Sequence, residues 1–376
     1  MRILHVVPSY KPAYIYGGPI ESVSKLCEGL VLNGNKVDVF TTTANGVSEL
    51  SMKPGTVDVV DGVTVTYFRR VTKDPTHISP ALWLQLFLRV KNYDIVHIHS
   101  WWNILVIIAA CICHLRGIKV VISPRGMLSE YILKSGNTKF KLMIHRTIGK
   151  FALSKCWFHA TADSESKECQ GIIKGWEGFT LPNIITLSDN LIKKKQNDAF
   201  NLIFLSRIHP KKGLELLFEA ISVLNYEVKL KIAGSGDQDY IDSLKIFAKN
   251  LGIFEKIEWV GWLNREEKFE ALMNADLFVL VSMNENFANV VIEALHMGTP
   301  VLLSEDVALS SFVKHHDLGW ICSLTKENVT SGLNEVYNDQ DKLKRINKES
   351  RKIIGENFLE GKLIQDYVQE YQRIIE

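Results

Sequence analysis

Cysteine pairs are scarce in this sequence. Its six cysteines are scattered along 376 residues, and only Cys111 and Cys113 lie close together. This C-x-C has no second pair at the spacing of a zinc site, and the remaining cysteines form no disulfide framework. We therefore expect buried, reduced thiols of the kind found in cytosolic proteins.

Long hydrophobic runs are lacking as well. The most apolar stretch, ILVIIAACIC at 104–113, is about half the length needed to span a bilayer. The opening MRILHVVPSY is too short for a signal peptide and is typical of a first β-strand. We expect a cytoplasmic protein, or one bound peripherally to the cytoplasmic face of the inner membrane.

Neither sign of charge is in large excess. The formal net charge of +2 argues neither for nor against a polyanionic partner. The basic residues do not alternate with aromatic residues along a stripe, so we expect no nucleic-acid partner.

Strand-like and helix-like segments alternate along the whole chain. Continuous apolar strands interleaved with helices indicate parallel sheets covered on both faces. Because 376 residues exceed one ordinary core, two such blocks predict two Rossmann-like, doubly wound α/β domains. The expected strands are at 2–7, 36–42, 94–100, 119–124, 201–207, 228–234, 256–261, 276–282 and 301–304.

The domain boundary is expected in LPNIITLSDNLIKKKQND (181–198), which has a Pro–Asn break and a lysine run. We assign 1–185 to an N-terminal domain and 186–357 to a C-terminal domain. Apolar residues recur at helical spacing near the C-terminus, so 358–376 should form an amphipathic helix that packs back on the N-terminal domain.

Ligands of open parallel sheets bind at the carboxyl ends of the strands. In the second block the segments at these ends are RIHPKKG (207–213), GSGD (234–237), GWL (261–263) and ENFAN (285–289). We expect them to converge on one rim. Guanidinium and ammonium groups near a helix N-terminus would suit a diphosphate.

Two carboxylates stand eight residues apart in ENFANVVIEALHMGTP (285–300). Beside a diphosphate they would not neutralise charge, because they would repel it. Carboxylates do accept hydrogen bonds from sugar hydroxyls. Glu285 could therefore bind a sugar beyond the phosphates, and Glu293 the ribose diol of a nucleotide.

ENFANVVIEALHMGTPVL resembles the E-x7-E segment of retaining glycosyltransferases of family 4, which have the GT-B fold of two Rossmann-like domains facing a central cleft. The resemblance extends to YGGPIESV, DIVHIHS, SRIHPKKG, AGSGD and VGWL. In the family the position of Ala288 is often Gly. The resemblance implies transfer of a hexose from a nucleotide-diphosphate sugar to a saccharide or lipid-linked saccharide, as in the building of bacterial surface polysaccharides such as lipopolysaccharide or capsule.

The resemblance also implies roles for single residues in the donor domain. Arg207 and Lys212 would hold the donor diphosphate together with the backbone of 287–289. Glu285 would hold the transferred sugar and act in catalysis. The residues that would bind the diphosphate through the backbone are Phe287, Ala288 and Asn289, and those that would bind the nucleotide are Gly234, Leu263 and Glu293.

In the first domain the resemblance implies a tight loop at Gly17 and Gly18 that faces the donor phosphates. His99 would lie at the reaction centre, with His97 the weaker choice. We expect the two imidazoles of HIH to point to opposite sides of the strand, so that only one faces the cleft. Arg125, in SPRGML, would contact the acceptor or a phosphate.

Retention without an obvious enzyme nucleophile suggests front-face displacement, in which the leaving diphosphate oxygen takes the acceptor proton. No cofactor and no metal are expected, since Arg207 and Lys212 already supply positive charge. The sequence does contain D-x-D twice, at Asp237–Asp239 and Asp339–Asp341.

Three alternatives compete with a transferase. A dehydrogenase would need G-x-G-x-x-G after the first strand, where PSYKPAYIYGG stands instead. A nucleotide-sugar epimerase of the same fold, or a protein that binds nucleotide sugars without turning them over, is harder to separate from the main interpretation.

The segment 131–162 carries several Lys and Arg residues and no Asp or Glu. Interspersed apolar residues would make it an amphipathic helix. The hypothesis is a weak contact with an anionic membrane surface, and the alternative is an ordinary core-facing helix with a solvated face.

Overall fold

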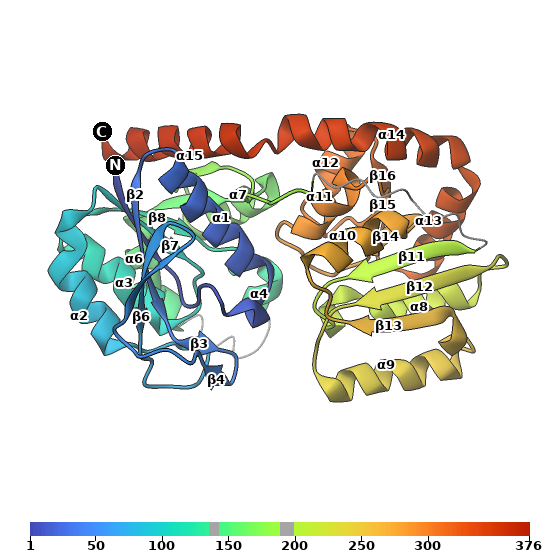
Figure 1. The fold of residues 1–376 in the computed structure, drawn as a ribbon, viewed down its shortest axis with the longest axis horizontal. Coiled ribbons are helices and arrows are strands. Elements are labelled where there is room, and N and C mark those ends of the chain that lie inside the picture. The colour runs from blue at the N-terminus through green and yellow to red at the C-terminus, as the bar shows by residue number, and fades with distance from the viewer. Residues whose placement is uncertain (135–142, 189–198) are drawn as a thin grey trace. The chain divides into compact units, whose positions relative to one another are not determined.

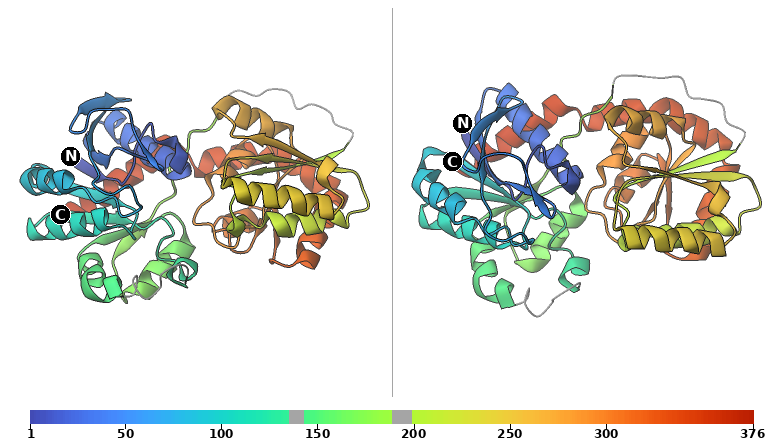
Figure 2. Two further views of the ribbon diagram at one scale, coloured as in Figure 1. Left: turned by 90° about the horizontal axis from the view of Figure 1, so that it is seen from below. Right: turned by 60° about the horizontal axis from the view of Figure 1, so that its bottom comes forward.

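The computed structural model describes residues 1–134, 143–188 and 199–376. Contacts divide the chain into two compact units. Unit 1 comprises Met1–Thr186 with Glu360–Glu376, and unit 2 comprises Leu187–Leu359. Each unit contains one large sheet (Figure 1), and Figure 2 shows helices on both faces of each sheet. The prediction of two doubly wound α/β domains is confirmed.

Unit 1 is built on an eight-stranded sheet in which every pairing is parallel except that of the edge strand β5. Across the sheet the strands are β10 (Gly178–Thr180), β9 (Trp157–Ala160), β8 (Lys119–Ser123), β7 (Ile95–His99), β1 (Arg2–Val6), β2 (Lys36–Thr42), β6 (Val63–Phe68) and β5 (Val57–Val60). A short hairpin of β3 (Ala44–Asn45) and β4 (Ser48–Glu49) follows β2.

Alternate residues of each strand face two separate cores. In β1, Leu4 belongs to one buried cluster and Ile3 to the other. The first cluster contains side chains of α2 (Pro80–Arg89) and α3 (Ile104–Leu115), and the second contains side chains of α1 (Gly18–Leu32) and α15 (Glu360–Ile375). The remaining helices of unit 1 are α4 (Glu130–Lys134), α6 (Lys150–Ser154) and α7 (Asp163–Ile172).

The C-terminal helix α15 belongs to unit 1. It buries one stripe of residues, Leu363, Ile364, Tyr367, Tyr371 and Ile374, and this confirms the predicted amphipathic pattern. The helix packs closely on α1: a Cβ at Gly29 would lie 2.4 Å from Cδ1 of Ile364. Glycine at this position therefore allows the two helices to approach.

Unit 2 contains a six-stranded, wholly parallel sheet. Its strands, in order across the sheet, are β13 (Ile257–Gly261), β12 (Val228–Ala233), β11 (Phe200–Leu205), β14 (Leu277–Leu280), β15 (Val301–Ser304) and β16 (Gly319–Cys322). The helices are α8 (Leu214–Ser222), α9 (Gln238–Asn250), α10 (Arg265–Asn274), α11 (Asn289–His296), α12 (Ser310–His315), α13 (Lys326–Asn338) and α14 (Gln340–Asn357). The α8 helix packs on α13, and α11 packs on α14.

All six cysteines are free, and only Cys111 is not fully buried, as the sequence predicts. Within the described ranges, every helix is too short or too polar to cross a bilayer.

Residues 135–142 of the proposed membrane-contacting segment lie outside the described residues. The rest forms α4, a π-helical turn at His145–Gly149, α6 and strand β9, so the expectation of one amphipathic helix over 131–162 is wrong. Met143, Ile148 and Phe151 are each more than half exposed, and Nζ of Lys155 lies 4.8 Å from the ring of Phe151. The described residues 143–155 therefore expose both apolar and cationic side chains, as the membrane hypothesis requires.

Candidate active site

The four loops predicted to share a rim in unit 2 do meet at the carboxyl edge of its sheet. They follow β11, β12, β13 and β14, which are parallel neighbours. Backbone hydrogen bonds of 2.7–2.8 Å join them, from Ile208 to Ser235, from Gly234 to Gly261 and from Met283 to Lys211.

Two glycines allow this close packing. At Gly234, with φ of 142°, a Cβ would lie 1.9 Å from the carbonyl oxygen of Ser206. At Gly213, with φ of 71°, it would lie 2.2 Å from the carbonyl oxygen of Val281. Any side chain would force the loops apart, because real Cβ atoms do not approach backbone oxygens so closely.

Lys212 and Glu285 form an ion pair at this edge. Nζ of Lys212 donates to Oε1 of Glu285, and Nζ of Lys211 lies 3.8 Å from the same oxygen. The side chains of Lys212 and Glu285 are 7% and 13% exposed. Burial lowers the pKa of Lys212, while the carboxylate of Glu285 opposes that shift. A buried ammonium with one counter-ion is suited to a second anion, such as a phosphate.

The N-terminus of α11 adds further positive potential beside Glu285. Its first turn contains no acidic residue, so no carboxylate there offsets the helix dipole. Ala288 caps the helix in the left-handed region, with φ of 59°. Phe287 is buried and lies edge-on to Phe358, with ring centroids 6.2 Å apart. The backbone of Phe287, Ala288 and Asn289 thus leads into the N-terminus of α11, and its binding of a phosphate stays a prediction.

Glu293 lies on α11 and is 4% exposed. Its Oε1 accepts a hydrogen bond from Nζ of Lys268, at 2.6 Å. Lys268 belongs to α10 and was not predicted, since no spacing in the sequence links the two. Arg207 is exposed and has no ion pair in the described part of the chain, and Leu263 is partly buried. The proposed roles of these residues stay predictions.

In unit 1 the prediction that His97 and His99 point to opposite sides of β7 is wrong. Residues two apart on a strand share a face, and the two rings stack with centroids 4.1 Å apart. His5 on β1 and His159 on β9 lie on the same face. This face is covered by α1 and α15, so all four imidazoles are buried.

A chain of hydrogen bonds with one direction runs through this face. Nε2 of His159 lies 2.9 Å from the carbonyl oxygen of Leu181 and must carry the proton. Nδ1 of His159 then accepts from the hydroxyl of Ser123, which accepts from Nε2 of His97. Nδ1 of His97 is left to accept from the hydroxyl of Tyr371, at 2.6 Å. Each buried imidazole thus has a fixed tautomer.

His99 has both ring nitrogens engaged. Its Nδ1 accepts from Arg125, at 3.3 Å from Nη2, and its Nε2 lies 2.9 Å from Nδ1 of His5. The imidazole is 1% exposed. Burial is also the main cause that lowers the pKa of His99 well below its ordinary value, so the ring is neutral at pH 7. In this arrangement His99 orients its neighbours rather than presenting a free nitrogen.

Arg125 is the group that His99 orients. Its Nη1 donates to Oγ of Ser22 (3.0 Å) and to Oδ1 of Asn183 (3.1 Å), and no ion pair joins it to a carboxylate in the described ranges. Ser100, the first residue after β7, and Arg125, the second residue after β8, have φ of 75° and 55°. Left-handed backbone at non-glycine residues costs free energy and clusters at functional sites. Neither Ser22 nor Asn183 was predicted from the sequence.

The Gly17–Gly18 loop lies next to this group. Gly17 has φ of 71° and caps α1, and Gly18 is the first residue of that helix. Ser22, the partner of Arg125, is in the first turns of the same helix. The structure therefore places the predicted residues of unit 1, His97, His99, Arg125, Gly17 and Gly18, around one helix N-terminus and the adjacent strand ends.

One ring nitrogen from each of His5, His97 and His99 lies within 4.8 Å of the other two, a spacing that could suit a metal ion. The hydrogen bonds described above use five of the six ring nitrogens of these histidines, and the guanidinium of Arg125 would oppose a second cation. The sixth, Nε2 of His5, is buried without a hydrogen-bond partner in the described ranges. The arrangement fits a hydrogen-bonded cluster better than a metal site.

The D-x-D pairs have helix-capping roles. Oδ1 of Asp237 accepts from the backbone N–H of Tyr240 at the start of α9, and Oδ1 of Asp339 accepts from that of Lys342 at the start of α14. One acid of each pair is therefore committed to a helix end.

Family models match both halves of the chain. The model "Glycosyltransferase Family 4" matches residues 16–165, and "Glycosyl transferases group 1" matches residues 189–353. An uncharacterized glycosyltransferase of Methanocaldococcus jannaschii is 26% identical over 100% of this chain and 99% of its own.

Solved structures share the fold. The Anabaena protein HepE in complex with UDP-glucose superposes with a TM-score of 0.75 at 17% identity, covering 98% of this chain and 99% of its own. WaaG, a glycosyltransferase involved in lipopolysaccharide biosynthesis, superposes with a TM-score of 0.74 at 15% identity, covering 97% of this chain and 98% of its own. With both family models and the fold in agreement, this chain belongs to the family 4 glycosyltransferases of the GT-B fold.

Proposed function

We propose that this glycosyltransferase moves a hexose from a nucleotide-diphosphate sugar to a hydroxyl of a saccharide or lipid-linked saccharide, with retention of configuration. The Lys212–Glu285 pair beside the N-terminus of α11 carries the proposal. The ion pair brings a buried ammonium and a carboxylate together beside the first amides of α11. HepE, which has the same fold, is described in complex with UDP-glucose.

Unit 2 would hold the donor. Arg207, Lys212 and the start of α11 bind the diphosphate, and Glu285 accepts hydrogen bonds from hydroxyls of the transferred sugar. Gly234 and Leu263 contact the nucleotide, and Glu293, held by Lys268, accepts from the ribose diol. Charge developing on the leaving diphosphate is stabilised where these cations already lie.

Unit 1 would serve the acceptor and the reaction centre. Arg125 contacts a phosphate or the acceptor, His99 and His5 fix its position, and Gly17 and Gly18 face the donor phosphates. In the front-face step the C1–O bond to the diphosphate breaks as the acceptor oxygen bonds to C1 on the same side. The leaving oxygen takes the acceptor proton, so no enzyme nucleophile and no metal are needed.

The test is a thermal-shift panel of UDP-, GDP- and ADP-sugars, followed by turnover with varied acceptors and NMR of the product anomer. A ligand at 100 times its dissociation constant should stabilise the protein by about 2.7 kcal/mol. Release of an α-linked product from an α-linked donor is expected. Inverted product would overturn retention, a C2-epimerised product would favour the epimerase, and binding without turnover would favour a sensor.

The biological setting proposed is surface-polysaccharide synthesis on the cytoplasmic face of the inner membrane, with weak contact through α6 and its neighbours. Met143, Ile148 and Phe151 are exposed beside Lys150 and Lys155. Each cation near an anionic leaflet contributes about 1 kcal/mol. In liposome flotation, binding should need anionic lipid and decline with salt, and equal binding to neutral vesicles would contradict the electrostatic contact.

A further inference from the structure

A pocket of about 250 Å³ opens in unit 1 at the carboxyl ends of β2 and β6. We call it the β2–β6 pocket. Its lining is apolar on one side and cationic on the other, and consists of Thr43, Glu49, Leu50, Met52, Pro54, Arg69, Arg70, Val71 and Lys73. None of these residues belongs to the site described above.

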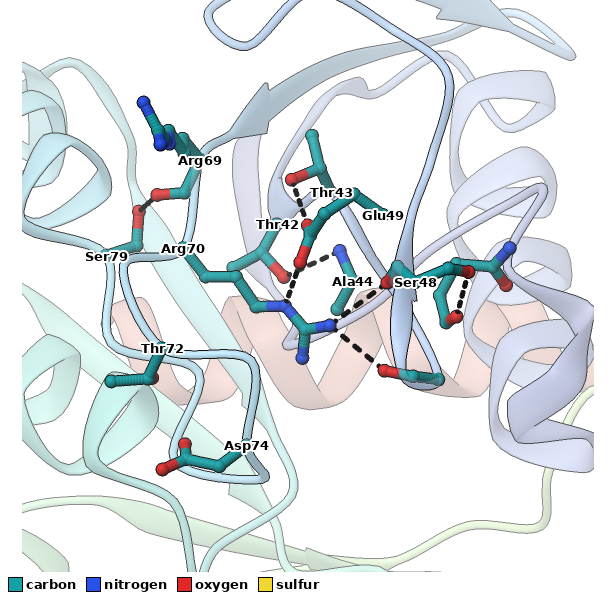
Figure 3. Close-up of polar contacts among 12 residues, drawn as sticks. Thr42, Thr43, Ala44, Ser48, Glu49, Arg69, Arg70, Thr72, Asp74 and Ser79 are labelled. Carbon is teal, nitrogen blue, oxygen red and sulfur yellow. Dashed lines mark hydrogen bonds and ion pairs between the residues drawn. The ribbon is translucent and has the colours of Figure 1, made fainter.

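Arg70 forms a fixed wall of this pocket. Its side chain is 1% exposed, and its Nε donates to Oε1 of Glu49 at 2.6 Å. Nη2 donates to the carbonyl oxygens of Gly46 (3.0 Å) and Ser48 (3.1 Å), and Thr43 donates to the second oxygen of Glu49 (Figure 3). The only carboxylate in the lining is therefore already neutralised.

Arg69 and Lys73 are the unbalanced charges. Both are exposed, and neither side chain has a hydrogen bond or an ion pair with any residue of the described ranges. Figure 3 shows the guanidinium of Arg69 directed away from the Arg70–Glu49 pair. Exposed side chains change rotamer within nanoseconds, so Arg69 can turn toward a ligand. Two cations without a partner in the described ranges therefore lie beside a pair whose charges already balance.

The pocket is connected to the predicted reaction centre within unit 1. The carboxyl ends of β2, β6 and β7 share one edge of the sheet. Three strand spacings, roughly 14 Å, separate β6 from β7. The backbone N–H of Gly46 donates to the hydroxyl of Tyr16, at 2.9 Å, and the carbonyl of Gly46 accepts from Arg70. Tyr16 directly precedes the Gly17–Gly18 loop.

We propose that the β2–β6 pocket binds an anionic group, a phosphate or a carboxylate, carried by the acceptor substrate. This rests on the proposed function. At about 250 Å³ the pocket is smaller than an ordinary ligand pocket of roughly 300–1,000 Å³, and so fits one charged group with part of a sugar ring. Leu50, Met52 and Val71 would pack on the apolar side of that group, and Arg69 and Lys73 would bind its oxygens.

The experiment measures binding by calorimetry of the full chain with glucose 6-phosphate, farnesyl phosphate, inorganic phosphate and glucose, each in the presence of UDP to cover the donor site. The test variant is Arg69→Glu with Lys73→Glu. The control, Lys36→Glu with Lys91→Glu, makes the same change in net charge at exposed lysines of unit 1 outside the pocket lining. Unchanged circular dichroism shows that both variants fold.

Glucose 6-phosphate or farnesyl phosphate should bind at least about tenfold more weakly to the test variant, with the control unchanged and glucose giving no signal. The phosphate that binds more tightly identifies a sugar or a lipid carrier as the source of the anion. Equal affinity in the test variant and wild type would overturn the proposal, and so would binding of inorganic phosphate alone. If no UDP-sugar binds or reacts, the proposed function fails separately from this result.

Discussion

The hydroxyl of Tyr371 lies 2.6 Å from Nδ1 of His97, although 274 residues separate them in the sequence. Both groups are buried, and the tautomer of His97 leaves this nitrogen as an acceptor. Helix α15 therefore completes a hydrogen-bond chain that begins at the carbonyl of Leu181, directly after β10, and passes through Ser123 at the end of β8.

Tyr371→Phe should destabilise unit 1. The change leaves a buried imidazole nitrogen without a donor, which typically costs about 1–3 kcal/mol. Urea unfolding monitored by circular dichroism measures this loss. Tyr337→Phe is the matched control, because the Tyr337 hydroxyl makes no hydrogen bond within the described ranges and Tyr337 is 37% exposed. Equal loss in the two variants would contradict a specific role for the Tyr371 hydroxyl.

Acid should destabilise the protein through its buried histidines. Burial lowers the pKa values of His5 and His159 to about 3, from about 6.5 in the unfolded chain. The stability of the protein is therefore highest, as far as these two histidines are concerned, above pH 6.5. It falls as the pH decreases from 6.5 toward 3, because in that range the two histidines take up protons only in the unfolded chain. Each such histidine adds a slope of up to about 1.4 kcal/mol per pH unit.

His159→Gln should reduce the slope of the free energy of unfolding against pH by the contribution of one buried histidine. His315→Gln, at an exposed position, is the control variant. Urea midpoints between pH 4 and 7 give the comparison. A stability that does not change below pH 6 in the wild type would show that the buried imidazoles do not stay neutral.

Glu285→Ala should lower transfer by at least about 100-fold, or about 2.7 kcal/mol, while UDP still binds. The carboxylate is expected to contact the sugar, and Lys212 is expected to contact phosphate. Because Lys212 then loses its counter-ion, UDP should stabilise the variant more than the wild type. Glu305→Ala, at an exposed position, serves as the control. Arg207→Ala should instead weaken the binding of UDP. Comparable turnover in Glu285→Ala and wild type would remove Glu285 from the site.

Ala288→Gly should stabilise unit 2. Glycine relieves the strain of left-handed backbone at residue 288, which stabilises the folded state by about 1–2 kcal/mol. It also makes the unfolded chain more flexible, which lowers stability by about 0.4–1 kcal/mol, so we expect a net gain in stability of about 0.5–1 kcal/mol. Ala294→Gly, within the same helix, should destabilise instead. A loss of stability in Ala288→Gly would mean that the left-handed cap is not strained.

Transfer should persist in excess EDTA, and Asp239→Asn should stay within a few-fold of wild type. Under the proposed function, Lys212 and Arg207 supply the positive charge that a metal would otherwise bring to the diphosphate, and Asp237 caps α9. Activity that disappears on chelation and returns with Mn²⁺ would implicate Asp237 and Asp239 instead.

The apolar strands could be predicted from sequence because burial on both faces makes them continuous: β1, β2, β7, β8 and β11 all formed where expected. Strand β6, VTVTYF, was missed because its threonines interrupt the apolar run, although Thr66 is buried. The edge strand β10 and its neighbour β9 are too short to give a pattern.

The site was predictable only where one segment carries it. Glu285, Ala288 and Glu293 lie in a single stretch, so their arrangement follows from one loop and one helix. Lys268 and Tyr371, the partners of Glu293 and His97, come from distant segments. No local sequence pattern encodes such contacts. The prediction for His97 and His99 was wrong for another reason: side chains two residues apart on a strand point to the same face, so the sequence did predict that these two rings lie together.

The assignment of α15 to unit 1 has a consequence for synthesis. The ribosome delivers residues 1–186 long before 360–376, and unit 2 is made in between. Until residues 360–376 have been made, the surface of α1 at Gly29 and the imidazoles of His97 and His159 lack the helix that covers them. Unit 1 can therefore mature only after unit 2 has been synthesised, and a product that stops before residue 360 would expose the apolar face that α15 covers.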